Sequence, residues 1–330
     1  MAPTLLITGA TGFLGHYLIA AARKRWRVAG TFHRTRREDA ERLLAGIDSG
    51  RIDLTDFRDV RDMLDAVRPK AVIHTAALAD PNYCEQHPDE SLRVNLQATL
   101  NLAGLCGDRR IPFVFTSTDL VFDGTHAPYA EDGPVAPLNL YGEHKALAEQ
   151  AVLDRYDEAA ICRMPLMFGF SSNGRVPFFQ RMASEFQAGR PMTLFGDELR
   201  TPVSGPVAAA GLLRVAASGM DESINPEELE RVRGILHLGG RESISRYEMG
   251  LQMLKSLGLP ASLAEPISFR DVPAVAARAA NVSLDSSRAY ALGFDPPSIG
   301  KQIDWLLKKA QPLMNTDVKI RTRIDTEGRD

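Results

Sequence analysis

The chain has 330 residues, of which 44% are hydrophobic and 25% charged, the composition of a soluble globular protein. Its formal net charge is −3, so it lacks the positive field that would indicate nucleic acid or an anionic membrane as a partner. Its three cysteines are scattered and form no cluster with histidine, which argues against a disulfide framework and gives no sign of a metal site. No secretory signal pattern is present and no apolar run reaches the roughly 18 residues of a membrane-spanning helix, so we expect a cytoplasmic protein.

Apolar runs typical of strands alternate with helical patterns through the first half of the chain. Strands are predicted at residues 4–7, 28–32, 50–54, 71–74, 112–116 and 159–164. Helices are predicted at residues 17–24, 57–67, 92–106 and from residue 141 onward. Continuous apolar strands separated by helices indicate a parallel sheet covered on both faces. The predicted fold is therefore α/β, with a doubly wound parallel sheet of the Rossmann type.

Beyond residue 165 glycine and proline become frequent, which marks turns and exposed loops. Helices at 178–187 and 207–217 and a strand at 235–238 are predicted there. We expect a first domain over residues 1–165 and a smaller α/β domain, mainly over residues 166–310, with room for segments that cross back to the sheet. The aperiodic, polar residues 311–330 are predicted to be a loosely held tail.

A glycine loop with the spacing Gly9-x-x-Gly12-x-x-Gly15 follows the first predicted strand and opens a helix. In a dinucleotide-binding loop, Gly9 would permit the tight turn, Gly12 would let the backbone approach a pyrophosphate, and Gly15 would allow close packing of helix on strand. A plain strand-to-helix turn is the alternative, but the alternating pattern downstream favours the dinucleotide. The other expected cofactor contacts in the loop are Thr11, Phe13 and Leu14.

The end of the second predicted strand bears on which nicotinamide cofactor would bind. An NAD enzyme usually has an acid there for the ribose 2′-OH, whereas this chain has His33 and Arg34 and no acid before Glu38. An arginine can pair with a 2′-phosphate, so we expect NADPH, with NADH possible, although a merely solvated basic turn would look the same. Asp53, followed by Leu54, is predicted either to contact the adenine amino group or to cap the next helix.

Tyr141 and Lys145 form a Tyr-x-x-x-Lys pair at the start of a predicted helix, and Thr118 ends the strand before it. Residues four apart lie on one helical face, so Lys145 is expected beside Tyr141, where its ammonium would lower the tyrosine pKa and prepare it as an acid. Thr118, with Ser117 as the alternative, would donate a hydrogen bond to a substrate carbonyl. This order of elements predicts an enzyme that transfers a hydride and a proton at a carbonyl group.

The sequence resembles the extended short-chain dehydrogenase/reductases, and specifically the dTDP-4-dehydrorhamnose reductase-like family, over residues 1–309. The motifs that carry the resemblance lie at residues 8–15, 74–77, 84–88, 94–95, 117–124, 137–142 and 281–285. The resemblance implies NADPH-dependent reduction of a nucleotide-linked 4-keto-6-deoxysugar, with Thr118, Tyr141 and Lys145 as the catalytic triad. It also implies that Ala76 and Ala77 line the cofactor groove and that Asn95 supports the active site.

The chain departs from the family pattern on the substrate side. Leu120 stands where the family usually has tyrosine, and the chain has Arg278-Ala279-Ala280 where the family usually has Arg-Pro before the late asparagine motif. Asp119 is not followed by the glutamate of the related dehydratases, which argues against that reaction. Arg163 and Arg200 would suit a nucleotide-sugar pyrophosphate, and an interdomain salt bridge is the alternative for each.

Two other functions stay open at this point. A sugar-nucleotide epimerase would use the same triad but retain its cofactor, usually NAD. A non-catalytic NADP-binding subunit is the second, because the regulatory β subunit of methionine adenosyltransferase shares the fold and resembles residues 200–203. The expected partner is a nucleotide-sugar substrate. Neither nucleic acid nor a membrane is expected as a partner, and a homodimer stays open.

Overall fold

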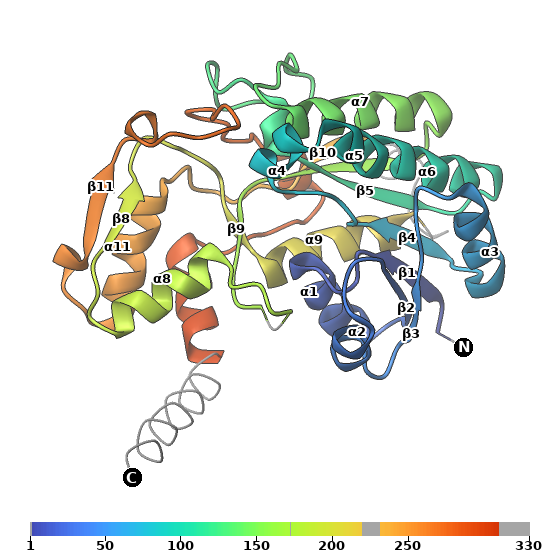
Figure 1. Cartoon of the computed structure of the whole chain (residues 1–330), viewed down its shortest axis with the longest axis horizontal. Helices are drawn as coiled ribbons and strands as arrows, with labels where there is room; N and C mark the ends of the chain where they lie inside the picture. The colour runs from blue at the N-terminus through green and yellow to red at the C-terminus, as the bar shows by residue number, and fades with distance from the viewer. Residues whose placement is uncertain (1, 172, 220–231, 310–330) are drawn as a thin grey trace, which may run out of the picture.

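A computed structural model describes residues 2–171, 173–219 and 232–309, and its centre is a seven-stranded parallel sheet (Figure 1). The strand order is β10-β6-β5-β4-β1-β2-β3, so the order reverses between β1 and β4. In open sheets of this kind ligands bind where the order reverses, at the carboxyl ends of the strands. The predicted α/β, doubly wound fold is confirmed. The strands are β1 (Thr4–Thr8), β2 (Arg27–Phe32), β3 (Asp48–Arg51), β4 (Ala71–His74), β5 (Phe113–Thr118), β6 (Ala160–Met164) and β10 (Gly234–His237).

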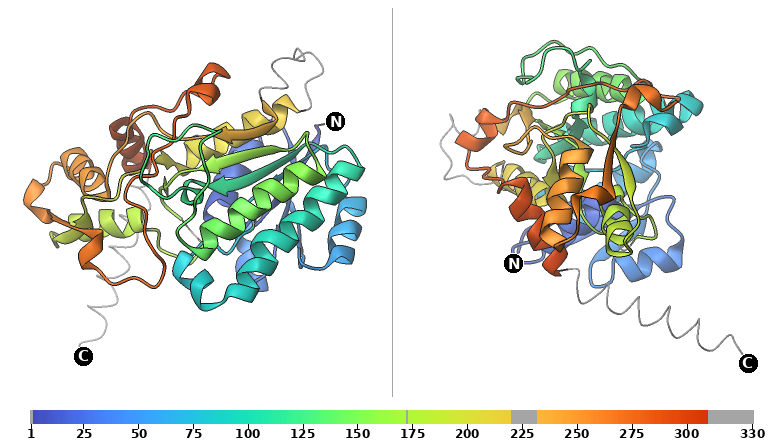
Figure 2. Two further views of the ribbon diagram at one scale, coloured as in Figure 1. Left: turned by 90° about the horizontal axis from the view of Figure 1, so that it is seen from above. Right: turned by 90° about the vertical axis from the view of Figure 1, so that its left-hand side faces the viewer.

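Helices cover both faces of the sheet, because the side chains of each strand alternate between two apolar cores. In β1, Leu5 and Ile7 face one core and Leu6 faces the other. The first core lies under α1 (Phe13–Ala22) and α9 (Gly205–Ser218). The second lies under α3 (Phe57–Val67), α6 (Ala98–Asp108) and α7 (Leu140–Arg155), which run side by side in the left view of Figure 2.

Among the element boundaries that differ from the sequence prediction, two concern the start of the first helix and the edge of the sheet. Helix α1 begins at Phe13, whereas the prediction had it begin at residue 17, because the glycine loop leads directly into the helix. Strand β3 spans residues 48–51, whereas the prediction was 50–54. It is an edge strand that pairs only with β2, and its residues Asp-Ser-Gly-Arg are mostly exposed, so it lacks the apolar run on which the prediction depended.

The second half of the chain adds a smaller α/β unit around a third apolar core (Figure 1, left). Its parallel pair of strands, β8 (Met192–Phe195) and β11 (Ala264–Ile267), packs with α8 (Phe178–Gln187), α11 (Arg246–Leu257) and the helical residues 299–309. Because α9 and β10 come from beyond residue 165 and yet belong to the large sheet and its cover, the division at residue 165 stays a prediction. The predicted tail, residues 311–330, lies outside the described residues.

Short elements connect these layers. They are α2 (Arg37–Leu43), α4 (Pro81–Gln86), α5 (Pro88–Leu92), a π-helical turn (Arg93–Gln97), β7 (Met167–Phe168), β9 (Val203–Ser204) and α12 (Ser287–Ala291), with 3-10 turns at Asp119–Val121, Ala261–Leu263 and Phe269–Asp271. Strands β7 and β9 pair with each other in parallel. None of the helices in the described part of the chain is long and apolar enough to cross a membrane.

Candidate active site

The glycine loop between β1 and α1 has the geometry that a close backbone approach requires. Gly9 has a φ of +67°, and a Cβ there would lie 2.8 Å from the Cα of Ala76. A Cβ at Gly15 would lie 2.6 Å from the carbonyl oxygens of Gly9 and Ala10, so α1 can pack this closely only with glycine. Gly12 precedes α1 without a side-chain cap from the described residues and with no acid in the first turn. The free N–H groups of that turn are therefore suited to an anion.

Neighbouring segments hold the glycine loop in place. The hydroxyls of Thr11 and Thr35 lie 2.7 Å apart, and the Asn173 side-chain amide donates to the Thr11 carbonyl oxygen at 3.1 Å. Phe13 lies edge-on to Tyr17, with 5.2 Å between ring centroids, and Leu14 is buried in the first core. The Ala76 N–H donates to the Thr8 hydroxyl at 3.4 Å, and Ala77 beside it is partly exposed. The loop is thus flanked by β4 on one side and by residues from the second half of the chain.

The basic turn after β2 is exposed at His33 and Arg34. Arg34 forms an ion pair with Glu90, and the His33 carbonyl oxygen accepts a hydrogen bond from Arg51 at 2.8 Å. These placements leave the predicted 2′-phosphate contact of Arg34 a prediction, and they add Glu90 as a partner that the sequence analysis did not identify.

Asp53 makes a local turn with Thr55, whose N–H and hydroxyl donate to its carboxylate at 2.9 and 2.7 Å. Partial burial opposes ionisation, but these hydrogen bonds prevail and hold the pKa of Asp53 below its usual value. The cap of α3 is Asp56, so Asp53 does not have the capping role that was its alternative. Leu54 is buried, and its carbonyl oxygen accepts from Asn101 at 3.2 Å.

Thr118 and Tyr141 meet where β5 ends and α7 begins. Asn139 caps α7 by accepting from the Gly142 N–H at 3.0 Å, which fixes the first turn that carries Tyr141. Tyr141 is buried and hydrogen-bonds to Thr118, the last residue of β5. Lys145, one turn further on, is also buried, with its ammonium nitrogen 3.9 Å from the centroid of the Phe115 ring.

Burial sets the protonation of this group. It raises the pKa of Tyr141 above its usual value, the nearby Asp119 adds to the rise, and the Thr118 hydrogen bond opposes it. Burial also lowers the pKa of Lys145 to about 7, against the charge of Glu149. A lowered tyrosine pKa was expected from the sequence, whereas burial raises it, and Lys145 is not among the groups that shift it in this structure. Desolvation penalises the charged forms of both side chains, which spacing along a helix does not reveal.

Asn95 fastens the segment that leaves β4. It lies in the π-helical turn, where its side-chain oxygen accepts from the Leu78 N–H at 2.9 Å and its amide donates to the Leu78 carbonyl oxygen at 3.1 Å. His74, at the end of β4, lies between the hydroxyls of Thr8 and Thr99, and burial lowers its pKa to about 3. His74 is therefore a neutral imidazole at physiological pH that ties β4 to its neighbours.

Arg163 and Ser117 share a buried carboxylate, that of Glu149. Arg163 donates from two nitrogens to Glu149, at 3.0 and 2.8 Å, and Ser117 donates to the same carboxylate. A further Arg163 nitrogen lies 3.3 Å from His237. The guanidinium is thus occupied by a salt bridge between β6 and α7, and we leave Arg163 and Ser117 out of the proposed substrate contacts.

Arg200 and Asp119 lie beside the catalytic candidates. The Thr118 hydroxyl donates to the Asp119 carboxylate at 3.2 Å, and the Nε of Arg200 lies 3.6 Å from the other Asp119 oxygen. Burial raises the pKa of Asp119 to about 6, and the charge of Arg200 opposes that rise. Arg200 is also 3.8 Å from Glu198, so it links Asp119 to a second carboxylate.

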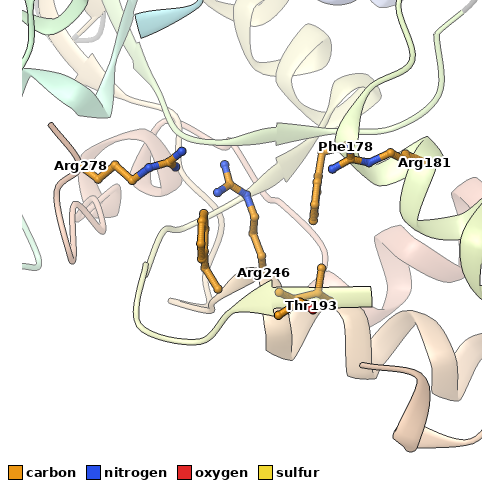
Figure 3. Close-up of a pocket in the computed structure, with 7 residues that line it drawn as sticks. Phe178, Arg181, Thr193, Arg246 and Arg278 are labelled. Carbon is orange, nitrogen blue, oxygen red and sulfur yellow. The ribbon is translucent and has the colours of Figure 1, made fainter. Parts of the chain in front are cut away.

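Two arginines that pair with Glu198 line a pocket of about 300 Å³, which was not predicted from the sequence (Figure 3). Arg246 and Arg278 line this pocket and lie 2.5 and 3.4 Å from the Glu198 carboxylate. The guanidinium carbons of Arg246 and Arg278 lie 5.8 and 5.0 Å from the centroid of the Phe195 ring. The Nε atoms of these two arginines are buried without a hydrogen-bond partner in the described structure. The lining residues are Phe178, Arg181, Thr193, Leu194, Phe195, Arg246 and Arg278.

No signal in the sequence brings this pocket together, because its residues come from α8, β8, α11 and a loop near residue 278. A local signal exists only for the start of α11, where Ser245 and Glu248 form a capping box that positions Arg246. Across the described ranges, no group of three or more His, Cys, Asp and Glu side chains is arranged to hold a metal ion.

Comparisons with known proteins agree with this architecture. A probable low-salt glycan biosynthesis reductase of Haloferax volcanii is 31% identical over 298 residues, which cover 89% of this chain and 93% of that protein. The β subunit of methionine adenosyltransferase 2 from Bos taurus is 30% identical over 292 residues, covering 88% of this chain and 82% of that protein. One relative is named as a reductase and the other as a subunit of an adenosyltransferase, so they do not by themselves separate catalysis from regulation.

Among solved structures, a dTDP-4-dehydrorhamnose reductase of Bacillus anthracis in complex with NADP superposes with a TM-score of 0.78 at 21% identity, covering 94% of this chain and all of that chain (100%). This likeness supports the fold. The model of the RmlD substrate binding domain matches residues 3–311, which include the glycine loop, the Thr118–Tyr141 pair and the arginine-lined pocket. By that match and by the 31% identity to the Haloferax protein, the chain belongs to the RmlD substrate binding domain family.

Proposed function

We propose that this protein is an NADPH-dependent reductase of a nucleotide-linked 4-keto-6-deoxysugar. The observation that carries the proposal is the buried Thr118–Tyr141 pair at the end of β5, with Lys145 one turn along α7. Two strands away in the sheet, β1 ends in a glycine loop whose helix has no side-chain cap among the described residues. A hydroxyl pair and an anion-binding loop at the carboxyl ends of nearby parallel strands suit reduction of a carbonyl by a dinucleotide.

The cofactor would lie across the ends of β1 and β4. The N–H groups after Gly12 would hold its pyrophosphate, Ala76 and Ala77 would line the groove, Lys145 would reach its ribose, and Arg34 would pair with its 2′-phosphate. A bound nicotinamide supplies the hydride.

The proton would come from Tyr141. Its raised pKa keeps the phenol protonated at neutral pH, so it starts the reduction as a donor to the developing alkoxide. Thr118 would orient the carbonyl through its hydroxyl. Lys145, with a pKa near 7, is charged in part of the population at neutral pH and would stabilise the phenolate left behind.

The arginine-lined pocket would hold the nucleoside diphosphate of the substrate. Phe178 and Phe195 line the pocket and offer rings against which a base can stack. Arg246 and Arg278 offer guanidinium groups to the phosphates (Figure 3). Arg200, between this pocket and Asp119, would connect phosphate binding with the reacting centre.

The direct test follows NADPH absorbance while the protein is mixed with a panel of dTDP-4-keto-6-deoxysugars. We expect oxidation of NADPH, and we expect Tyr141→Phe to reduce kcat by about 10²–10⁴-fold while its Kd for NADPH changes little. Rapid turnover by Tyr141→Phe would refute the assignment of the proton donor. Sugar conversion without net oxidation of the cofactor would indicate an epimerase.

A regulatory role is the second candidate, because a methionine adenosyltransferase β subunit is 30% identical over 88% of the chain. In that case the protein would bind NADPH, reduce none of the sugars and alter the activity of a methionine adenosyltransferase catalytic subunit mixed with it. Turnover of a keto sugar without such an effect would exclude this role.

A further inference from the structure

The exposed ion pair between Arg34 and Glu90 lies at the adenosine end of the proposed cofactor groove. Arg34 follows β2, and Glu90 lies in α5, which follows β4. In the sheet β1 stands between β2 and β4, and the glycine loop leaves the end of β1. The ion pair therefore joins the two segments that flank the glycine loop. The Thr11–Thr35 contact brings the turn that carries Arg34 against the same loop.

The Glu90 carboxylate is held in place on both oxygens. One oxygen pairs with Arg34, and the other accepts a hydrogen bond from the Tyr83 hydroxyl at 2.7 Å. Arg34 also lies 5.8 Å from the centroid of the Tyr83 ring. Tyr83 in turn packs against His87, with 4.2 Å between ring centroids. The carboxylate is thus a fixed negative charge next to the one side chain that we expect to recognise a 2′-phosphate.

We propose that Glu90 determines coenzyme preference by competing with the cofactor 2′-phosphate for Arg34. This inference rests on the proposed function, because it requires that a nicotinamide dinucleotide binds in the groove. A 2′-phosphate must displace Glu90 from Arg34 and then lies close to its negative charge. The uncharged 2′-OH of NADH meets neither obstacle, and a carboxylate can accept its hydrogen bond. Glu90 therefore weakens NADPH binding selectively and narrows the preference for NADPH over NADH.

Glu90→Gln tests this directly, because it keeps the size and the hydrogen-bond acceptor and removes the charge. The Kd values for NADPH and NADH are measured by calorimetry on the full chain, without sugar. We expect the Kd for NADPH to fall about fivefold, the size of an exposed ion pair, and the Kd for NADH to stay the same or rise. An unchanged ratio of the two Kd values would overturn the proposal.

Asp89→Asn is the matched control. Asp89 is the exposed neighbour of Glu90 on the same helix, so its substitution changes the net charge of α5 equally without touching Arg34. We expect a change of less than about twofold in either Kd. An equal gain in NADPH affinity in both variants would mean a general field effect and would refute competition for Arg34.

Arg34→Gln completes the cycle. In the Arg34→Gln background, Glu90→Gln should no longer improve NADPH binding by the same factor, because the contested cation is gone. If the unaltered protein binds neither dinucleotide, the proposed function fails together with this inference. If it binds NADPH but Glu90→Gln leaves the ratio unchanged, only the inference fails.

Discussion

Glu149 and Glu198 are equally buried, with side-chain exposures of 4% and 5%, and both pair with arginine, yet their surroundings differ. Two nitrogens of a single arginine, Arg163, donate to Glu149, and the remaining Arg163 nitrogen donates to the Glu131 carbonyl oxygen at 3.2 Å. Glu198 is shared by Arg200, Arg246 and Arg278. Glu149 is paired with one guanidinium, with the partly charged Lys145 near it, whereas Glu198 faces three guanidinium groups.

The difference separates a structural ion pair from a binding site. A matched pair with good geometry satisfies its own desolvation cost and gains nothing from a ligand. We call Glu198, Asp119, Arg200, Arg246 and Arg278 the Glu198 cluster. Even with Asp119 ionised, three arginines in this cluster face two carboxylates. The buried Nε atoms of Arg246 and Arg278 lack hydrogen-bond partners in the described structure. An anion would supply the missing charge and the missing acceptors.

Arg163→Met should destabilise the fold most. It removes the only guanidinium on Glu149 in the described structure and leaves a buried carboxylate without its hydrogen-bonded cation, because the nearby Lys145 is only partly charged at neutral pH; this costs about 3–5 kcal/mol. Denaturant unfolding of the two proteins measures the difference. Arg246→Met is the control, because Glu198 keeps Arg200 and Arg278 as partners. Equal losses in the two variants would contradict the contrast between the sites.

Asp119→Asn should change the pH dependence of stability. The folded pKa of about 6 lies above the ordinary value of 3.8, so the folded protein holds this proton more tightly than the unfolded chain does. The contribution of Asp119 to the free energy of unfolding therefore falls as pH rises from about 4 to about 6, by about 3 kcal/mol, and stays low above that range.

The measurement for Asp119 is the free energy of unfolding of both proteins from pH 4 to pH 8. The stability of the asparagine variant relative to the unaltered protein should increase with pH over this window. A difference that does not vary with pH would show that Asp119 keeps an ordinary pKa. The Asp119 carboxylate would then be largely ionised already near pH 4 and would offset part of the excess positive charge of the Glu198 cluster there.

The fold and the placement of Tyr141 and Lys145 on one helix could be predicted from the sequence because their signals are local. Apolar runs gave the strands, the glycine spacing gave the loop, and a four-residue separation put Tyr141 and Lys145 on one face of α7. The pairing of Arg163 with Glu149 could not be predicted, since it depends on how β6 packs against α7. Arg163 and Arg200 look alike in the sequence, and only their carboxylate partners distinguish them.

The missed pocket and the wrong direction of the tyrosine pKa have a common cause. Both depend on burial by distant segments, such as α8 and α11 around the pocket and β5 beside Lys145. A sequence pattern indicates which residues share a face, but it does not show how much water the rest of the chain excludes from that face.

Arg278→Met should impair substrate binding more than stability. Loss of one charge-assisted contact to a phosphate is expected to raise KM for the nucleotide sugar about 10–100-fold, with a smaller change in kcat. Steady-state kinetics with NADPH measure both constants, and the Kd of the nucleoside diphosphate alone gives an independent value. Arg278→Lys keeps the charge and should lose less. An unchanged Kd would mean that the excess positive charge of the Glu198 cluster does not bind the nucleoside diphosphate.

Arg155→Met should cause the smallest loss of stability among these substitutions. Arg155 ends α7 and donates to Asp108 at 2.5 Å, but both side chains are about half exposed, at 51% and 53%. Water and salt screen the pair, so its loss, with that of a cation at the helix C-terminus, should cost less than about 1 kcal/mol. Unfolding at low and at high salt measures it, and the cost should shrink as salt is added. The same substitution at Arg163 should be insensitive to salt, because burial excludes the counterions that screen Arg155. It is therefore the lack of solvent around Glu149 and Glu198, more than the count of ion pairs, that gives these two carboxylates their influence.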